Sequence, residues 1–392
     1  MTSPERISLS LLIPTLDRSG AEKQLVLLAT HLPRETFDIE VICLTRGGPL
    51  EDDLARHDIP VTVIGKKRRL DFPALSRLKR HLAKRSPDIL HTWLFAANSY
   101  GRLAHHRCPQ ARVVVSERCV DTWKSAWQLW LDRRLIRHTD LYLANANSVS
   151  DFYQSAGVPG DRIEVIHNAI AIDGLPTAGP DATSHRDALR SELGCGSDTV
   201  LVSCIGRLAP QKRISDLIWA NELLNHHPAD LRLIVVGDGP DRRTLERLAT
   251  QVGCRDRVHF LGHRTDVASI WAASDMAWHA SEFEGQSNSL MEAMAAGLPV
   301  VASDIASNAE LISDGHTGHL VPVGDAAAFA RRTCRLLEDP IHAWSLGEAA
   351  RAHLARSHGV PSMVKAHQEI YHRLLDLSPA GTSRDGLIKE VH

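Results

Sequence analysis

Short apolar runs recur along the whole chain, and polar or glycine-containing turns and helical stretches separate them. In the first half these runs lie at 7–13, 38–44, 61–64, 88–91, 112–115, 140–144 and 162–166. In the second half they lie at 200–205, 231–236, 258–261, 276–280, 300–302 and 319–322. Strands that alternate with helices form parallel sheets flanked by helices, so the pattern predicts an α/β fold.

The length of the chain favours two domains. A chain of 392 residues is long for a single hydrophobic core. Residues 173–184 are rich in Gly, Pro, Ala and Thr, which is typical of a linker. We therefore expect a first domain at 1–172 and a second at 185–361. An amphipathic helix is predicted at about 362–377, and the polar tail at 378–392 is predicted to be mobile.

Composition is that of an ordinary globular protein, with 43% hydrophobic and 23% charged residues. The seven cysteines include no Cys-x-x-Cys pair, which favours a reducing compartment and argues against structural zinc. The first apolar run is too short for a signal peptide, and no apolar segment approaches the ~20 residues that span a bilayer. These features predict a cytoplasmic protein.

Positive charge is concentrated in one segment. Residues 65–138 carry 17 Lys and Arg against five Asp and Glu, although the whole chain has a net charge of −2. The segment includes Lys66 to Arg69 and a predicted helix at 73–85. Three tryptophans at helical spacing follow: Trp123, Trp127 and Trp130. One interpretation is a solvated basic face over buried aromatic residues; the other is a peripheral surface for anionic lipid on the inner face of a membrane. No nucleic-acid-binding module is recognisable.

The stretch at 278–304 places two carboxylates around the start of a helix. A helix is predicted at 290–296, with Ser287 or Asn288 as its cap. Glu284 precedes this helix, and Glu292 lies inside it, eight positions later. The helix amides favour an anionic ligand, while the two glutamates can accept hydrogen bonds from its hydroxyls. The alternative is an ordinary capped helix with surface glutamates.

Two other strand ends carry polar residues suited to the same kind of ligand. Arg207 and Lys212 follow the strand at 200–205, and two converging cations can hold a pyrophosphate. The alternative for them is two solvated charges on a surface loop. His91 ends another strand, where a lone histidine is more often structural than catalytic.

The stretch from Glu284 to Ala302 resembles the signature of family-4 retaining glycosyltransferases, which have the GT-B fold. That signature has two glutamates separated by seven residues, then Ala-Met-Ala and Gly-x-Pro-Val-Val-Ala, as at 293–295 and 297–302 here. The run from Gly206 to Lys212 matches the same family, and the resemblance covers about 370 residues. It implies two Rossmann-like domains that face each other across a cleft, with the last helix crossing back onto the first domain.

The resemblance also implies an activity, namely transfer of a sugar from a nucleotide-diphosphate donor to an acceptor hydroxyl with retention of configuration. Arg207 and Lys212 would stabilise the diphosphate, Glu284 would orient the sugar, and Glu292 would bind the ribose. His91 would face the donor sugar. The sugar would be a hexose or N-acetylhexosamine, and neither a metal nor a cofactor would be needed. The acceptor would be a glycan or lipid-linked glycan in cell-surface polysaccharide or glycolipid assembly.

Further residues correspond to family positions on the two sides of the cleft. On the donor side these are Ser19, Gly20, Gly206, Gly237, Gly262, His263, Gly285, Asn288, Ser289 and Leu290. On the acceptor side they are Trp93, Arg118 and Asn147. The chain departs from the family pattern at Ser287, where a proline is common, at Ser19, which replaces a glycine, and at Trp93, which replaces a histidine.

Two other functions fit the same architecture. A nucleotide-sugar epimerase would consume donor without any acceptor, and a non-catalytic nucleotide-sugar-binding subunit would bind nucleotide without releasing diphosphate. The set of Glu284, Glu292, Arg207 and Lys212 argues against the non-catalytic subunit.

Overall fold

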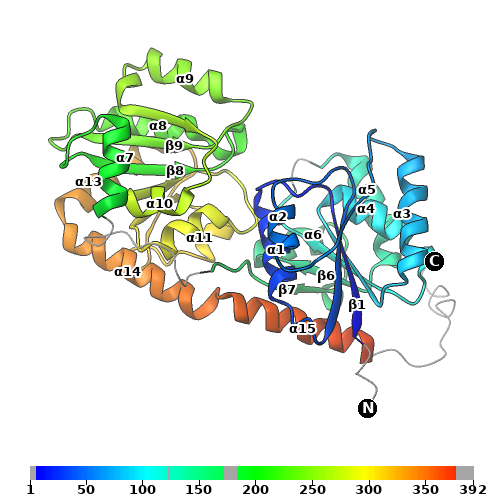
Figure 1. Ribbon diagram of the computed structural model, residues 1–392. Helices are drawn as coiled ribbons and strands as arrows, with labels where there is room; N and C mark the ends of the chain where they lie inside the picture. Colours follow the sequence, from blue (N-terminus) through cyan, green and yellow to red (C-terminus); the bar gives the residue numbers. More distant parts are fainter. Residues whose placement is uncertain (1–5, 122–123, 172–182, 377–392) are drawn as a thin grey trace.

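The computed structural model describes residues 6–121, 124–171 and 183–376, which form two α/β units side by side (Figure 1). Each unit is built on one parallel sheet with helices on both faces. Every strand predicted from the apolar runs is present, with boundaries that differ by at most a few residues. Parallel strands are buried on both faces, which is why their sequences read as continuous apolar runs.

The first unit contains, within the described residues, a seven-stranded sheet with the order β3-β2-β1-β4-β5-β6-β7. Its strands are β1 (Ile7–Ile13), β2 (Phe37–Cys43), β3 (Val61–Val63), β4 (Ile89–Trp93), β5 (Arg112–Glu117), β6 (Leu141–Ala144) and β7 (Ile163–Val165). Its helices are α1 (Gly20–His31), α2 (Glu51–Ala55), α3 (Phe72–Arg85), α4 (Phe95–Ala104), α5 (Ala126–Leu135) and α6 (Asn147–Ser155). Leu9, Leu11 and Val41 on β1 and β2 are fully buried in its core.

The second unit has, among the described residues, a six-stranded sheet with the order β10-β9-β8-β11-β12-β13. Its strands are β8 (Val200–Ile205), β9 (Leu231–Val236), β10 (Val258–Gly262), β11 (Met276–His279), β12 (Val300–Ser303) and β13 (His319–Val321). Its helices are α7 (Thr183–Leu193), α8 (Ile214–Leu223), α9 (Arg242–Gln251), α10 (Val267–Ala273), α11 (Asn288–Ala295), α12 (Ala306–Ala309) and α13 (Ala326–Glu338). All strand pairings in both sheets are parallel.

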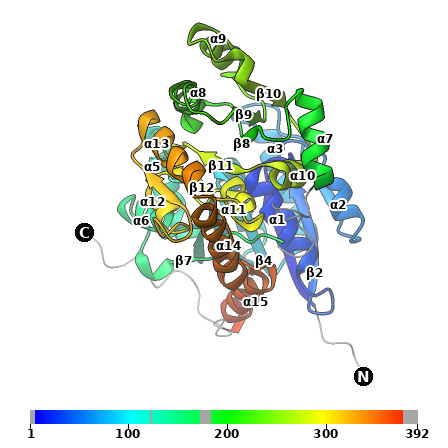
Figure 2. The same cartoon turned by 90° about the vertical axis from the view of Figure 1, so that its left-hand side faces the viewer.

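Two long helices join the units along one side of the molecule. α14 (Pro340–Ser357) lies under the second unit and α15 (Val360–Asp376) under the first, as Figures 1 and 2 show. Ala350 and Leu354 of α14 pack beneath α11, whereas Met363 and Tyr371 of α15 belong to the core around β1 and β2. The last helix therefore crosses onto the first sheet, as the resemblance implied, and it begins at Val360.

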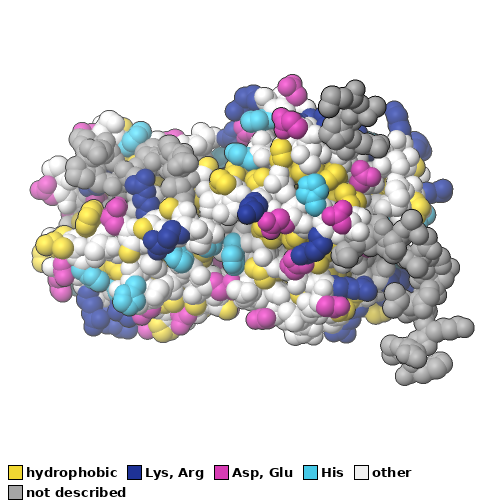
Figure 3. Space-filling view, turned by 90° about the horizontal axis from the view of Figure 1, so that it is seen from below, with side chains coloured by type: hydrophobic (Ala, Val, Ile, Leu, Met, Phe, Trp, Pro, Cys, Tyr) yellow, Lys and Arg dark blue, Asp and Glu magenta, His cyan; other side chains and the backbone are white. Residues whose placement is uncertain are grey.

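The predicted linker at 173–184 lies mostly outside the described residues, and its last two residues belong to α7. The domain boundaries and the tail at 378–392 therefore stay predictions. Acidic and basic side chains are interspersed on the face that carries α14 and α15 (Figure 3). Among the described helices, none combines the length and the apolar composition that crossing a bilayer requires.

Candidate active site

The loops that follow strands of both sheets meet between the two units. Gly285, in the loop after β11, lies so close to the first unit that an added Cβ would stand 2.1 Å from the Arg118 carbonyl oxygen. Arg118 directly follows β5. Parallel sheets bind ligands outside the carboxyl ends of their strands, so this junction is where a site is expected.

Two helix N-termini converge at this junction. Ser287 caps α11, and its hydroxyl accepts a hydrogen bond from the Leu290 amide at 3.4 Å. Asn288, the first residue of α11, donates from Nδ2 to the carbonyl oxygen of Gly20, the first residue of α1, at 3.0 Å. Helix N-termini attract anions because their free amides and dipoles point outward. The neighbouring side chain of Leu290 is buried in the core, so only its backbone can face a ligand.

Lys212 and Glu284 form an ion pair between the loops after β8 and β11. The same Glu284 oxygen accepts a hydrogen bond from the Ser281 hydroxyl at 2.7 Å, and the His279 ring nitrogen lies 3.8 Å away. Burial raises the pKa of Glu284, but the Lys212 charge and these neighbours outweigh it and leave the pKa below its ordinary value. Burial lowers the pKa of His279 to about 4. At neutral pH the site therefore presents a carboxylate beside a neutral imidazole.

Arg207 lies on the same loop as Lys212 and is exposed. Within the described residues it makes no ion pair, so its guanidinium is available to an anion. The loop is shaped by tight contacts between backbones. Gly237 has φ of +127°, and a Cβ there would lie 1.9 Å from the carbonyl oxygen of Gly206, so only glycine fits. The Gly237 amide donates to the Gly262 carbonyl at 2.8 Å. This contact brings together the turns after β8, β9 and β10, beside the exposed His263.

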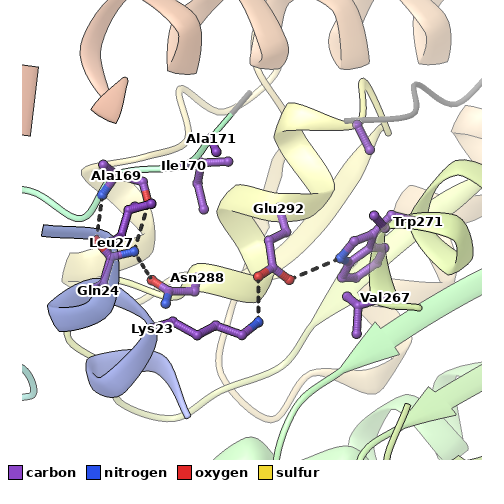
Figure 4. Close-up of a pocket in the computed structure, with 12 residues that line it drawn as sticks. Lys23, Gln24, Leu27, Ala169, Ile170, Ala171, Val267, Trp271, Asn288 and Glu292 are labelled. Carbon is purple, nitrogen blue, oxygen red and sulfur yellow. Dashed lines mark hydrogen bonds and ion pairs between the residues drawn. The ribbon is translucent and has the colours of Figure 1, made fainter. Parts of the chain in front are cut away.

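Glu292 lies one turn further into α11 and borders a cavity of about 290 Å³ between the units (Figure 4). One carboxylate oxygen pairs with the Lys23 ammonium of α1 at 3.1 Å. The other accepts a hydrogen bond from the Trp271 indole of α10 at 3.5 Å. Apolar side chains, among them Leu27 and Val267, line the rest of the cavity. Glu284 and Glu292 thus lie on different parts of the junction, and their roles toward a ligand stay predictions.

On the side of the first unit, Arg118 lies at the edge of the junction. Trp93, predicted on the acceptor side, is instead buried in the core of the first unit with 1% exposure, so the prediction that it meets an acceptor is corrected. The Arg118 guanidinium stacks over the Trp93 ring at 4.6 Å and donates to the side-chain oxygen of Asn168. Asn168 donates in turn to the Gln286 carbonyl at 3.0 Å and to Asn288 at 2.7 Å. Arg118 is therefore connected through Asn168 to the loop that carries Glu284.

His91 lies inside the core of the first unit, where its ring centre is 5.1 Å from that of the buried Trp93. It is fully buried, its Nδ1 is 2.7 Å from the Tyr371 hydroxyl on α15, and its Nε2 is 2.8 Å from the Ser116 hydroxyl on β5. Both ring nitrogens are engaged inside the first core, so none is left for a donor sugar. The predicted contact of His91 with the donor is corrected accordingly. His91 was predicted at the end of its strand, but it lies in the middle of β4, and its side chain points toward Tyr371 of α15.

Two other predicted residues have contacts of their own. Asn147 begins α6, and its backbone and side-chain nitrogens donate to Glu310 of the second unit at 2.7 and 3.0 Å. Asn147 thus joins the two units through Glu310. Ser19 is exposed and caps α1 without a side-chain hydrogen bond. The Ser289 hydroxyl lies 3.2 Å from that of Ser287 at the start of α11.

Several residues of the junction were not predicted. Ser281 and His279 touch Glu284, Lys23 and Trp271 touch Glu292, and Gln286 joins the units. Ser281 and His279 precede Glu284 closely, so proximity alone could have suggested them. Lys23 and Trp271 are distant from Glu292 in sequence, and only the packing of α1 and α10 against α11 brings them near.

The chain is similar to known glycosyltransferases over both units. Residues 18–173 match the family described as Glycosyltransferase Family 4, and residues 199–339 match Glycosyl transferases group 1. These regions cover most of the chain, which therefore belongs to the family-4 glycosyltransferases. HepE of Anabaena, solved in complex with UDP and glucose, is 24% identical, with a TM-score of 0.84 over 94% of this chain and all of that one. This likeness shows the GT-B fold.

Three relatives are moderately similar to this chain in sequence. N-acetyl-alpha-D-glucosaminyl L-malate synthase of Bacillus anthracis is 29% identical over 61% of each chain, so the chain spans about three-fifths of that relative. UDP-Gal:alpha-D-GlcNAc-diphosphoundecaprenol alpha-1,3-galactosyltransferase of Escherichia coli is 26% identical over 84% of this chain and 87% of its own. D-inositol 3-phosphate glycosyltransferase of Xylanimonas cellulosilytica is 28% identical over 93% and 90%.

Proposed function

We propose that this protein is a retaining glycosyltransferase that moves a hexose or N-acetylhexosamine from a nucleotide-diphosphate donor to an acceptor hydroxyl. The observation that carries the proposal is the junction itself. The Lys212–Glu284 pair and two helix N-termini lie between the units, and Arg207 is exposed on the loop that carries Lys212. Such a group of cations and amides suits a diphosphate, and the neighbouring carboxylates suit the hydroxyls of a sugar and a ribose.

In this proposal the cations act on the leaving group. Negative charge grows on the departing diphosphate, so Arg207 and Lys212 stabilise the transition state more than the ground state. Glu284 is ionised, as its lowered pKa requires, and accepts hydrogen bonds from the sugar near the reacting carbon. It is therefore not a proton donor to the leaving group. Glu292 accepts hydrogen bonds from the ribose, and the chain's own cations provide the positive charge without a resident metal.

The acceptor in this proposal is a glycan or lipid-linked glycan of cell-surface polysaccharide or glycolipid assembly. The named acceptor of the Escherichia coli relative, a diphosphoundecaprenol-linked sugar, supports a lipid-linked acceptor. We place the acceptor on the side of Arg118, whose backbone lies against the loop that carries Glu284 and Gly285.

A surface on the first unit supports attachment to a cytoplasmic membrane face. Four large apolar side chains are exposed there by 42% to 77%: Leu70, Phe72, Trp127 and Trp130. The Arg69 guanidinium lies 5.0 Å from the centre of the Trp127 ring, which brings the basic segment and α5 together. We call these four residues with Lys67, Arg68 and Arg69 the basic-aromatic surface. Trp123 lies outside the described residues, and Lys124, counted among the neighbouring basic residues, is buried.

A screen for diphosphate release tests the proposal. Nucleotide sugars with different bases would be supplied with and without lipid-linked acceptors. We expect release that depends on the acceptor, and a loss of roughly 10–100-fold in kcat/KM in Arg207→Ala and in Lys212→Ala, with unchanged circular dichroism. An altered sugar nucleotide formed without acceptor would indicate the epimerase, and nucleotide binding without release would indicate the non-catalytic subunit. Normal turnover in both variants would refute the diphosphate assignment.

A further inference from the structure

The ion pair between Lys23 and Glu292 spans the two units at the edge of the cavity. Lys23 belongs to α1, and its side chain is 41% exposed, whereas the Glu292 side chain is 19% exposed. Figure 4 shows the two side chains extending toward each other from opposite sides of the cavity, with Trp271 behind the carboxylate. We propose that Lys23 is a donor-binding residue of the first unit, whose ammonium engages the diphosphate of the bound nucleotide. This inference rests on the proposed function.

Position along the two helices supports this role. Asn288 and Gly20 are joined by a hydrogen bond at the N-termini of α11 and α1. Glu292 lies four residues beyond Asn288, and Lys23 lies three residues beyond Gly20. Each is therefore about one helical turn, roughly 5 Å, from the point where the two N-termini meet. A nucleotide with its ribose on Glu292 and its phosphates at the helix N-termini would pass directly by the Lys23 ammonium.

The balance of charges around the site also supports a phosphate-binding role for Lys23. Arg207 and Lys212 are opposed by Glu284 and Glu292, so these four charges sum to zero. A nucleoside diphosphate brings several negative charges into this neutral set. Lys23 supplies the additional cation, and it does so from the opposite unit. A lysine suits this task because its ammonium is a point charge on a flexible stem and can move from one oxygen to another.

Lys23 can serve the ligand without costing Glu292 its own function. A carboxylate accepts up to about four hydrogen bonds, and Glu292 uses one from Lys23 and one from Trp271. Ribose hydroxyls can take the remaining positions, or replace the ammonium as it turns toward phosphate. The Trp271 indole meanwhile holds the carboxylate in place. The consequence is that donor binding draws α1 of the first unit onto the nucleotide held by the second.

The competing explanation is that Lys23 merely holds Glu292 in an ion pair. The two explanations predict different effects of the same substitution on the binding of a diphosphate and of its nucleoside. Calorimetry would measure the binding of UDP, GDP and ADP, and of uridine, guanosine and adenosine, to wild type and Lys23→Met. If Lys23 engages the phosphates, Lys23→Met weakens binding of the preferred diphosphate about 10-fold or more and leaves its nucleoside unchanged or tighter. If Lys23 only holds Glu292, the substitution changes the affinities for the diphosphate and for its nucleoside alike, or changes neither, and either result would overturn the inference.

Two controls make the test specific. Lys23→Arg retains a phosphate-binding cation and should restore most of the diphosphate affinity. Lys365→Met removes a lysine of similar kind, 77% exposed on α15 and paired with Glu369, and should change nothing. Thermal unfolding should be alike for both methionine variants, since exposed ion pairs contribute little stability. Failure of wild type to bind any of the three diphosphates would instead count against the proposed function.

Discussion

Two groups of charged residues in this protein are built from the same side chains and differ in what surrounds them. Lys124, in the first unit, is fully enclosed and lies 3.0 Å from Asp121, 2.9 Å from Asp132 and 3.8 Å from Glu117. Tyr153 closes the group, accepting from Lys124 at 2.6 Å and donating to Asp121 at 2.6 Å. Lys212, at the junction, has Glu284 as its one ion-pair partner among the described residues.

The comparison shows that the burial of a charged group indicates whether it can only stabilise the fold or can also bind a ligand. The Lys124 ammonium contacts three carboxylates and the Tyr153 hydroxyl inside the core, so this group holds α5 and the end of β5 together. The Lys212–Glu284 pair is 18% and 12% exposed, and Arg207, on the same loop as Lys212, has no ion-pair partner among the described residues. These charges are therefore incompletely used within the fold. An anionic ligand requires cationic side chains whose charge is not fully paired within the fold.

Substitution of the two lysines by methionine should separate these roles, with the largest effect at Lys124. Lys124→Met leaves three carboxylates enclosed with only Arg102, 2.6 Å from Asp132, as a cation. Breaking a buried ion pair from one side typically costs about 3–5 kcal/mol. We expect a loss of that order in the free energy of unfolding, measured by chemical denaturation.

Lys212→Met is the matched substitution. It should lower stability less, because water can reach Glu284 at the junction, and should abolish most of the turnover. Equal stability of the two variants would show that the Lys124 group is not structural.

The two glutamates of the junction should be separable by their ligands, with an effect of intermediate size. Glu292→Ala removes the carboxylate that borders the cavity and should weaken binding of the bare nucleoside diphosphate about 10-fold or more. Glu284→Ala should leave that binding nearly intact and depress turnover, because its partner is the sugar. Calorimetry with the diphosphate product and steady-state kinetics would measure both. Equal losses of product affinity in the two variants would contradict this division of roles.

The fold was predictable from sequence because its signal is local. Each strand is an apolar run, some helices begin at a capping side chain, as α11 does at Ser287, and parallel pairing follows from the alternation of strands and helices. Gly237 was predictable as a turn residue for the same reason, and its φ of +127° explains why glycine stands there. The junction was predictable in part, because Arg207, Lys212, Glu284 and Glu292 follow strands or begin a helix.

The remaining errors concern side-chain direction and long-range packing. His91 was predicted at the end of a strand, but β4 continues to Trp93, so His91 lies in mid-strand with its side chain on the face that α15 covers. No local pattern indicates that Tyr371 will meet a residue 280 positions earlier. The burial of Lys124 could not be predicted, because its partners Glu117, Asp121 and Asp132 come from different parts of the chain. Such convergence is a property of the assembled core.

The smallest expected effect is on membrane attachment, and it concerns cations of the first unit that belong neither to the Lys124 group nor to the junction. Lys67, Arg68 and Arg69 are exposed next to Leu70, Phe72, Trp127 and Trp130 on the basic-aromatic surface. A basic residue near an anionic membrane contributes about 1 kcal/mol, so Arg68→Gln with Arg69→Gln should weaken attachment by about 2 kcal/mol. Co-sedimentation with anionic vesicles measures this, and binding should fade with salt because charges are screened beyond about 8 Å at physiological ionic strength.

The matched control removes two exposed arginines from the second unit, Arg243 and Arg247 of α9. Net charge then changes equally in both double variants, so a general attraction to anionic vesicles would weaken both alike. A specific basic-aromatic surface weakens only the variant at Arg68 and Arg69. Trp130→Ser should reduce attachment further at high salt. Salt screens the attraction between charges but does not weaken insertion of the indole ring into the membrane surface. If wild type ignores anionic vesicles even at low salt, the exposed tryptophans do not serve a membrane and the acceptor is reached from solution.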